Sequence, residues 1–200
     1  MRRFLIVMIA LGLSACQVVR APLAFIWRHH HGKPAMAAAS APRPAEGLWA
    51  ILDPGCPKPS QADIHAWPSC ASPFWLNRGK ALVVREASGR TSAMLDASYA
   101  ANYHLDPGDP LIAEVGTPKD GYLFLALTDL TENGRGQLVG ATGAAVACPG
   151  PASSAISIKP SSSGCGVQPL AAVRKAAVLA LQDRTALNEV AFIAPGAPSL

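Results

Sequence analysis

Tyr122-Leu-Phe-Leu-Ala-Leu-Thr128 is an apolar segment between two turn sequences, and the expected fold is built outward from it. A run that is apolar almost throughout is typical of a central strand covered on both faces. Gly116-Thr-Pro-Lys-Asp-Gly121 precedes it and Glu132-Asn-Gly-Arg-Gly136 follows it, and their Asp-Gly and Asn-Gly pairs reverse a chain at positive φ. The sequence therefore predicts a three-stranded antiparallel meander from Leu111 to about Ala147.

Short apolar runs bounded by turn residues continue on both sides of this segment. The other candidate strands are Leu48–Leu52, Phe74–Leu76, Ala81–Arg85, Leu111–Val115, Gln137–Ala141 and Asn188–Ile193. A helix is predicted after Pro169, because proline is favoured at the first helical position. Its apolar face comprises Leu170, Val173, Ala177 and Leu181, whereas Arg174, Lys175 and Gln182 point elsewhere. The expected fold class is α+β: a mainly antiparallel sheet with one C-terminal helix.

The first 15 residues have the pattern of an export signal. Arg2 and Arg3 precede the apolar run Phe4–Gly12, which is too short to cross a membrane because a span takes about 20 residues. Leu13-Ser-Ala-Cys16 resembles the lipobox of bacterial lipoproteins. This resemblance implies that residues 1–15 are removed and that Cys16 is acylated. Gln17 then implies the outer membrane, facing the periplasm. An ordinary secretory signal is the alternative.

Residues 16–46 are interpreted as a tether rich in proline and alanine, and residues 47–200 as a single globular domain. Six of the 17 basic residues precede residue 47, so 11 basic residues remain against 12 acidic ones beyond Glu46. A near-neutral domain excludes nucleic-acid binding, because it has no basic footprint for phosphates. The cations of the tether suit anionic lipid headgroups instead.

Two features of the tether leave alternatives open. The segment Leu23-Ala-Phe-Ile-Trp27 is placed either at the bilayer interface, where tryptophan is favoured, or against the domain. His29, His30 and His31 are adjacent residues in a flexible stretch and do not converge on one ion, so we expect solvated side chains and no metal site there.

Four cysteines remain once Cys16 is set aside, and an even number in an exported chain favours two disulfides. Proximity favours the pairs Cys56–Cys70 and Cys148–Cys165 among the three possible connectivities. Each closes a short loop rich in proline, glycine or serine and contributes about 3 kcal/mol. Zinc binding is the alternative, but the chain has no Cys-x-x-Cys pair.

The search for catalytic motifs finds no nucleophile elbow, metalloprotease motif, P-loop or dinucleotide fingerprint. We therefore predict no catalytic residue, no cofactor and no metal site. His65, near Asp63, and His104, in a turn before Asp106, are interpreted as surface histidines. Trp49, Trp67 and Trp75 lie near the first cysteine pair and either cap a small core or line a ligand groove.

Gly47-Leu48-Trp49 at the start of the first strand is similar to the Gly-x-Trp motif of lipocalins, and Thr128-Asp129 to their Thr-Asp motif. This resemblance implies an eight-stranded barrel that carries a small apolar ligand. Asp53-Pro-Gly-Cys56 ends the first strand early, and eight evenly spaced strands are not countable in the sequence. In overall texture the chain resembles the small uncharacterised lipoproteins of proteobacteria, a resemblance that implies no activity.

These observations favour a lipid-anchored envelope protein that is not an enzyme and presents a surface to another envelope component. The alternative is a lipocalin-like carrier with a small apolar ligand near Trp49 and Trp75. A hydrolase with an unrecognised site is the third hypothesis.

Overall fold

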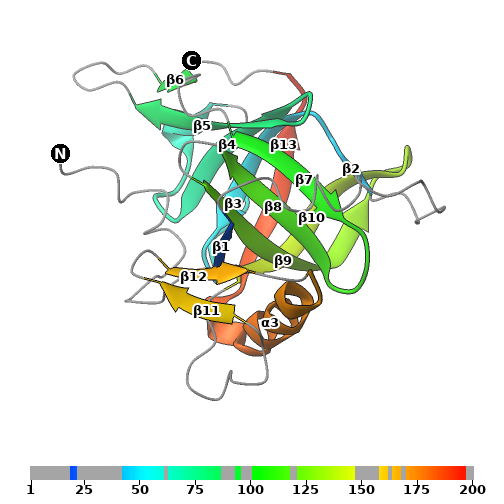
Figure 1. Cartoon of the computed structure of the whole chain (residues 1–200). Helices are drawn as coiled ribbons and strands as arrows, with labels where there is room; N and C mark the ends of the chain where they lie inside the picture. The colour runs from blue at the N-terminus through cyan, green and yellow to red at the C-terminus, as the bar shows by residue number, and fades with distance from the viewer. Residues whose placement is uncertain are drawn as a thin grey trace. The chain divides into compact units, whose positions relative to one another are not determined.

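The computed structural model describes residues 19–21, 42–60, 63–86, 93–95, 101–117, 121–146, 158–161, 164–167 and 170–196 (Figure 1). Within these ranges the chain forms one α-helix, two single 3₁₀ turns and thirteen strands. The strands are β1 (Val19–Ala21), β2 (Arg43–Pro44), β3 (Gly47–Leu52), β4 (Ala71–Asn77), β5 (Lys80–Glu86), β6 (Ala93–Leu95), β7 (Ala101–Asp106), β8 (Leu111–Thr117), β9 (Gly121–Glu132), β10 (Gln137–Ala145), β11 (Ile158–Ser161), β12 (Gly164–Val167) and β13 (Asn188–Ala194). The α-helix is α3 (Leu170–Gln182), and the 3₁₀ turns are η1 (Ile64–Ala66) and η4 (Arg184–Ala186).

Eight of the strands are hydrogen-bonded to one another in a cycle. The neighbours are β9, β8, β7, β5, β4, β3, β13 and β10, and β9 also pairs with β10. The registers of β3 with β4 and β13, of β4 with β5 and of β8 with β9 are antiparallel. This is the strand order of an eight-stranded barrel, which is more specific than the meander that the sequence predicts.

Two compact units make up the chain, and we describe each by itself. The helix-bearing unit comprises residues 1–41, 103–128 and 143–187. The disulfide-bearing unit comprises residues 42–102, 129–142 and 188–200. Strands β7, β9 and β10 contribute residues to both.

In the disulfide-bearing unit β3 pairs with β4 on one side and with β13 on the other (Figure 1). Leu48, Ala50 and Leu52 on one face of β3 are at most 1% exposed, and Trp49 on the other face is 2% exposed, so apolar side chains on both faces are buried. A strand buried on both faces reads as a continuous apolar run, as Leu48–Leu52 does. The register sets Trp49 directly opposite Phe74 on β4 and Phe192 on β13.

In the helix-bearing unit α3 packs its small residues against β8 and β9. Val173, Ala176 and Ala177 share a core with Ile112, Phe124 and their neighbours. These helix residues lie three and four positions apart, and side chains at that spacing share one face of a helix. Alanine lets the helix approach the sheet closely, and the larger Leu170 and Leu181 pack at the edges of this core.

The predicted meander is confirmed, because β8 pairs antiparallel with β9 and β9 pairs with β10. The turn at Glu132–Gly136 forms as its residues predict. The side-chain oxygen of Asn133 accepts hydrogen bonds from the backbone N–H groups of Arg135 (2.9 Å) and Gln137 (3.0 Å), and Gly136 has a φ of 68°. The helix and the final strand also lie where the sequence places them.

The sequence reading misses strand β7, which completes the cycle of eight. Its residues Ala101–Asp106 are mostly half-buried and alternate between apolar and polar side chains. This period of two is a strand signal. It is overlooked because the turn signal of Leu105-Asp-Pro-Gly108 is extended back over His104. His104 consequently lies on a strand, and the turn that the sequence places around it begins only after Asp106.

Two short strands fall inside the stretch that the sequence reading assigns to the tether. β1 pairs in parallel with β12 and antiparallel with β9, and β2 pairs in parallel with β10. The predictions for Cys16, for Leu23–Trp27 and for His29–His31 lie outside the described residues. Among the residues that the structure describes, no helix is both long enough and apolar enough to cross a membrane.

At Gly47, the first residue of β3, there is no room for a side chain. Its φ is 145°, and an added Cβ would lie 2.3 Å from the carbonyl oxygen of Ala194 on β13. We expect Gly47→Ala to lower the free energy of unfolding by more than about 1 kcal/mol, because the new side chain meets both a strained backbone and a fixed carbonyl.

Gly134→Ala is the matched control, since an added Cβ there meets no atom within 4 Å. Urea denaturation of both variants measures the difference, and we expect the control to stay within about 0.5 kcal/mol of the parent. Equal stability of the two variants would contradict the register of β3 with β13.

Candidate functional site

The three tryptophans that the sequence singles out all lie in the disulfide-bearing unit. Trp49 is 2% exposed and is enclosed by two other rings. Its ring centroid lies 6.1 Å from that of Phe74 in a stacked arrangement and 5.7 Å from that of Phe192 in an edge-on arrangement. The indole Nε1 donates a hydrogen bond of 2.9 Å to the carbonyl oxygen of Ala45. A buried indole needs such a partner, so Trp49 is fully accommodated by the protein itself.

Trp75 and Trp67 are half-buried. The Nε1 of Trp75 donates to the carbonyl oxygen of Gly196, 3.0 Å away, which fixes the chain just after β13 to β4. Trp67 packs against a small apolar group formed by Leu48, Ile64 and Ile193. The assignment of these tryptophans to a ligand groove stays a prediction, and their shared role in the structure is to join strands β3, β4 and β13.

A disulfide joins Cys56 to Cys70, with 5.8 Å between the two Cα atoms. This confirms the first of the two pairings that the sequence favours. The bridge closes the loop that connects β3 to β4, and the backbone N–H of Asp53 donates to the carbonyl oxygen of Cys70 at the same point (3.1 Å). Cys148 lies outside the described residues, and only the backbone of Cys165 is described, on β12. The second pairing therefore stays a prediction.

Asp63 and His65 lie inside this disulfide-closed loop and are exposed. The Asp63 carboxylate accepts a hydrogen bond from the backbone N–H of His65 (3.0 Å), so it caps the 3₁₀ turn η1. This is the local bond by which aspartate begins a turn. Asp183 does the same for η4, and the Thr185 hydroxyl and backbone N–H hold the pKa of the Asp183 carboxyl below its ordinary value.

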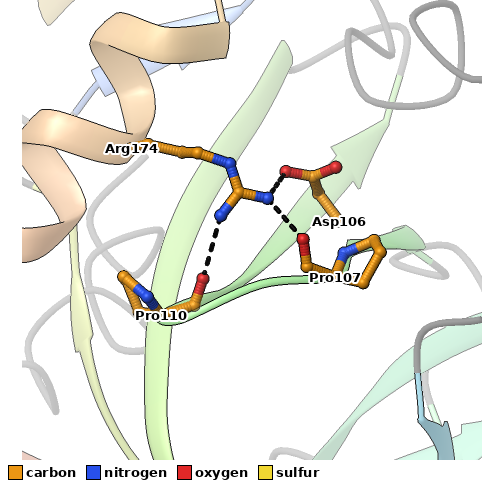
Figure 2. A network of polar contacts seen from close by, with 4 residues as sticks. All are labelled: Asp106, Pro107, Pro110 and Arg174. Atoms are coloured by element: carbon orange, nitrogen blue, oxygen red, sulfur yellow. Dashed lines mark hydrogen bonds and ion pairs between the residues drawn. The ribbon is translucent and has the colours of Figure 1, made fainter. Parts of the chain in front are cut away.

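The most buried ionic contact that the structure shows in detail lies in the helix-bearing unit. The guanidinium of Arg174, on α3, binds the carboxylate of Asp106, at the end of β7 (Figure 2). It also donates to the carbonyl oxygens of Pro107 and, at 3.3 Å, of Pro110. The Asp106 residue is 3% exposed, so the Arg174 guanidinium compensates the charge of a buried carboxylate.

Gly108 makes room for this contact. Its φ is 144°, and a Cβ at this position would lie 2.4 Å from a terminal nitrogen of Arg174. Arg174 thus lies across the loop between β7 and β8 and binds it at three points (Figure 2). The partners of Arg174 are backbone carbonyls and a buried carboxylate, so the arrangement joins α3 to this loop. It leaves few N–H groups of the guanidinium to bind a ligand.

The helical periodicity puts Arg174 off the apolar face of the helix but gives it no partner. Its long side chain reaches a loop 64 residues earlier in the sequence. The sequence signal that was present is the repeat of Asp-Pro in Asp106-Pro-Gly-Asp-Pro110, which marks a tight, carbonyl-rich turn. This turn signal does not indicate that Arg174 on the helix binds the loop.

Within the described part of the chain, no three His, Cys, Asp or Glu residues are grouped so that they could hold a metal ion. The chain matches no protein-family model, no curated protein and no solved structure.

Replacing Arg174 leaves the Asp106 carboxylate without its cation. We expect Arg174→Met to lower the free energy of unfolding by about 2–4 kcal/mol, since removing one partner of a buried pair leaves an uncompensated charge. Chemical denaturation measures the effect. Lys175→Met is the control on the adjacent, exposed position and should change stability by less than about 0.5 kcal/mol. Similar losses in both variants would show that the Asp106 contact contributes nothing.

The Cys56–Cys70 bridge joins two cysteines that are 14 positions apart in the sequence. We expect the double variant Cys56→Ser/Cys70→Ser to lose about 3 kcal/mol of unfolding free energy, because the unfolded chain regains the entropy of that loop. Thermal unfolding of the oxidised parent with and without a reductant provides the same comparison without mutation. If reductant leaves the stability of the parent unchanged while the double variant is destabilised, the lost stability comes from the serine substitutions and not from the missing disulfide.

Proposed function

We propose that the protein is a lipid-anchored protein of the bacterial cell envelope with a structural or binding role. The observation that carries this proposal is the N-terminal sequence, in which a charged pair, a short apolar run and Leu13-Ser-Ala-Cys16 occur in the order of a lipoprotein signal. The Cys56–Cys70 disulfide supports it, because disulfides form and persist in the oxidising compartments outside the inner membrane.

Two charged side chains of the described part of the chain are engaged in holding the fold. Arg174 binds the carboxylate of Asp106 and two backbone carbonyls, and Asp63 caps a turn. A role in binding or in envelope structure needs only the rigid framework and an exposed surface. This is the role that we assign to the two units.

Cys16→Ala tests the anchor. Without a thiol at this position no diacylglycerol is attached, so we expect the full-length variant to move from the membrane fraction to the soluble periplasmic fraction. Ser14→Ala is the control, since it keeps a small residue in the box and should stay with the membrane. Membrane association of Cys16→Ala that survives a high-salt wash would contradict the anchor.

A second candidate, a lipocalin-like carrier, is favoured by the cycle of eight hydrogen-bonded strands. Gly47-Leu48-Trp49 begins β3, the position that the lipocalin resemblance expects, and β13 brings Phe192 against Trp49. An eight-stranded barrel is wide enough to hold one small ligand. Native mass spectrometry of the exported Cys16→Ala chain separates the two candidates: a bound lipid-sized mass that denaturation releases supports the carrier, and a chain without added mass supports the interaction protein.

A further inference from the structure

Helix α3 has an exposed apolar face. Val178 and Leu179 are each 46% exposed, which places them among the few large apolar side chains that the described part of the chain leaves in solvent. Lys175, one turn earlier, is exposed on the same side. The opposite side carries Val173 and its neighbours into the core. We call Lys175, Val178 and Leu179 the α3 face.

The charge of this helix is of one sign. Leu170–Gln182 contains two basic residues and no acidic one, and Arg174 is engaged with Asp106, which leaves Lys175 as the free cation of the helix. Asp183 and Arg184, which follow the helix, are both exposed and of opposite sign. Apolar side chains beside a lysine are the combination found on helices that lie in the headgroup region of a membrane.

The pairing of β1 shows how close a lipid at Cys16 would lie to this helix. Only two residues separate Cys16 from Val19, and Val19 is paired with Cys165 on β12. A strand extends about 3.4 Å per residue, so three residues allow at most about 10 Å between Cys16 and the start of β1. β12, the partner of β1, ends three residues before α3 begins and contacts it. A lipid attached at Cys16 would therefore be held near the unit that contains α3.

We propose that the α3 face rests on the surface of an anionic phospholipid membrane, with Val178 and Leu179 among the headgroups. This inference rests on the proposed anchor at Cys16. A short anchor would hold lipid near the α3 face at an effective concentration in the millimolar range. An affinity of the face for lipid that is too weak to bind a free protein to a membrane is then enough. The cation Lys175 adds attraction to anionic headgroups. The helix-bearing unit thus sits directly against the lipid and not at the end of a long tether.

Quenching of tryptophan fluorescence by brominated lipids tests the contact in the full-length, acylated chain. Leu179→Trp places a reporter on the α3 face, where the side chain is 46% exposed. In vesicles of phosphatidylethanolamine and phosphatidylglycerol, we expect Leu179→Trp to be quenched beyond the parent. Quenching no greater than that of the parent would overturn the proposal.

Vesicle binding by the unlipidated Cys16→Ala chain provides a test that does not depend on the anchor. We expect weak binding to anionic vesicles that falls roughly tenfold in Val178→Asp/Leu179→Asp, because two half-buried apolar contacts are lost. Leu130→Asp should bind as the Cys16→Ala chain does. Indistinguishable binding by all three chains would reject the α3 face. Fractionation of the full-length protein decides the anchor separately, so the failure of one proposal is not mistaken for the failure of the other.

Discussion

The packing of Trp49 between Phe74 and Phe192 is the interaction on which the disulfide-bearing unit depends. It joins three strands whose residues are far apart in sequence, with ring centroids 6.1 and 5.7 Å apart. Such contacts form only when β3 lies between β4 and β13 in the observed register. Gly47 at the start of β3 makes that register possible, because the carbonyl of Ala194 occupies the space of a side chain. The disulfide then fixes the loop that leaves β3, and the indole of Trp75 fixes the end of β13.

A different interaction organises the helix-bearing unit. Its core is made of small residues on α3 packed against β8 and β9, which supplies close contact but little apolar area per residue. Arg174 adds a polar link from the helix to the loop after β7. Removing one partner of such a pair is destabilising, because the remaining charge then lies in a buried site. Gly108 belongs to the same arrangement: its φ of 144° is one that other residues rarely adopt, and an added Cβ would meet the guanidinium of Arg174.

Local patterns in the sequence predict much of this fold. Seven of the eight strands in the hydrogen-bonded cycle, the helix and one disulfide follow from apolar runs, turn pairs and cysteine spacing. β7 is the exception: Ala101–Asp106 alternates between apolar and polar residues, but the Asp-Pro-Gly turn signal that follows it masks this pattern, and the contact of Asp106 with Arg174 is long-range. The strand pairings of Val19–Ala21 and Arg43–Pro44 are likewise set by their neighbours on β12, β9 and β10. Long-range partners of this kind leave no mark on the local sequence.

The pairing of β1 also changes how the proposed anchor acts. A tether of 30 residues would let the protein move away from the membrane. If Cys16 is acylated as proposed, a strand that begins three residues later would keep one unit beside it. The most direct test is the intact mass of the full-length protein extracted from membranes. We predict a chain that begins at Cys16, carries the mass of a diacylglyceryl group and an N-linked acyl chain, and lacks the two hydrogens of the Cys56–Cys70 bridge. A chain without acyl mass, or one that begins elsewhere, would contradict the account.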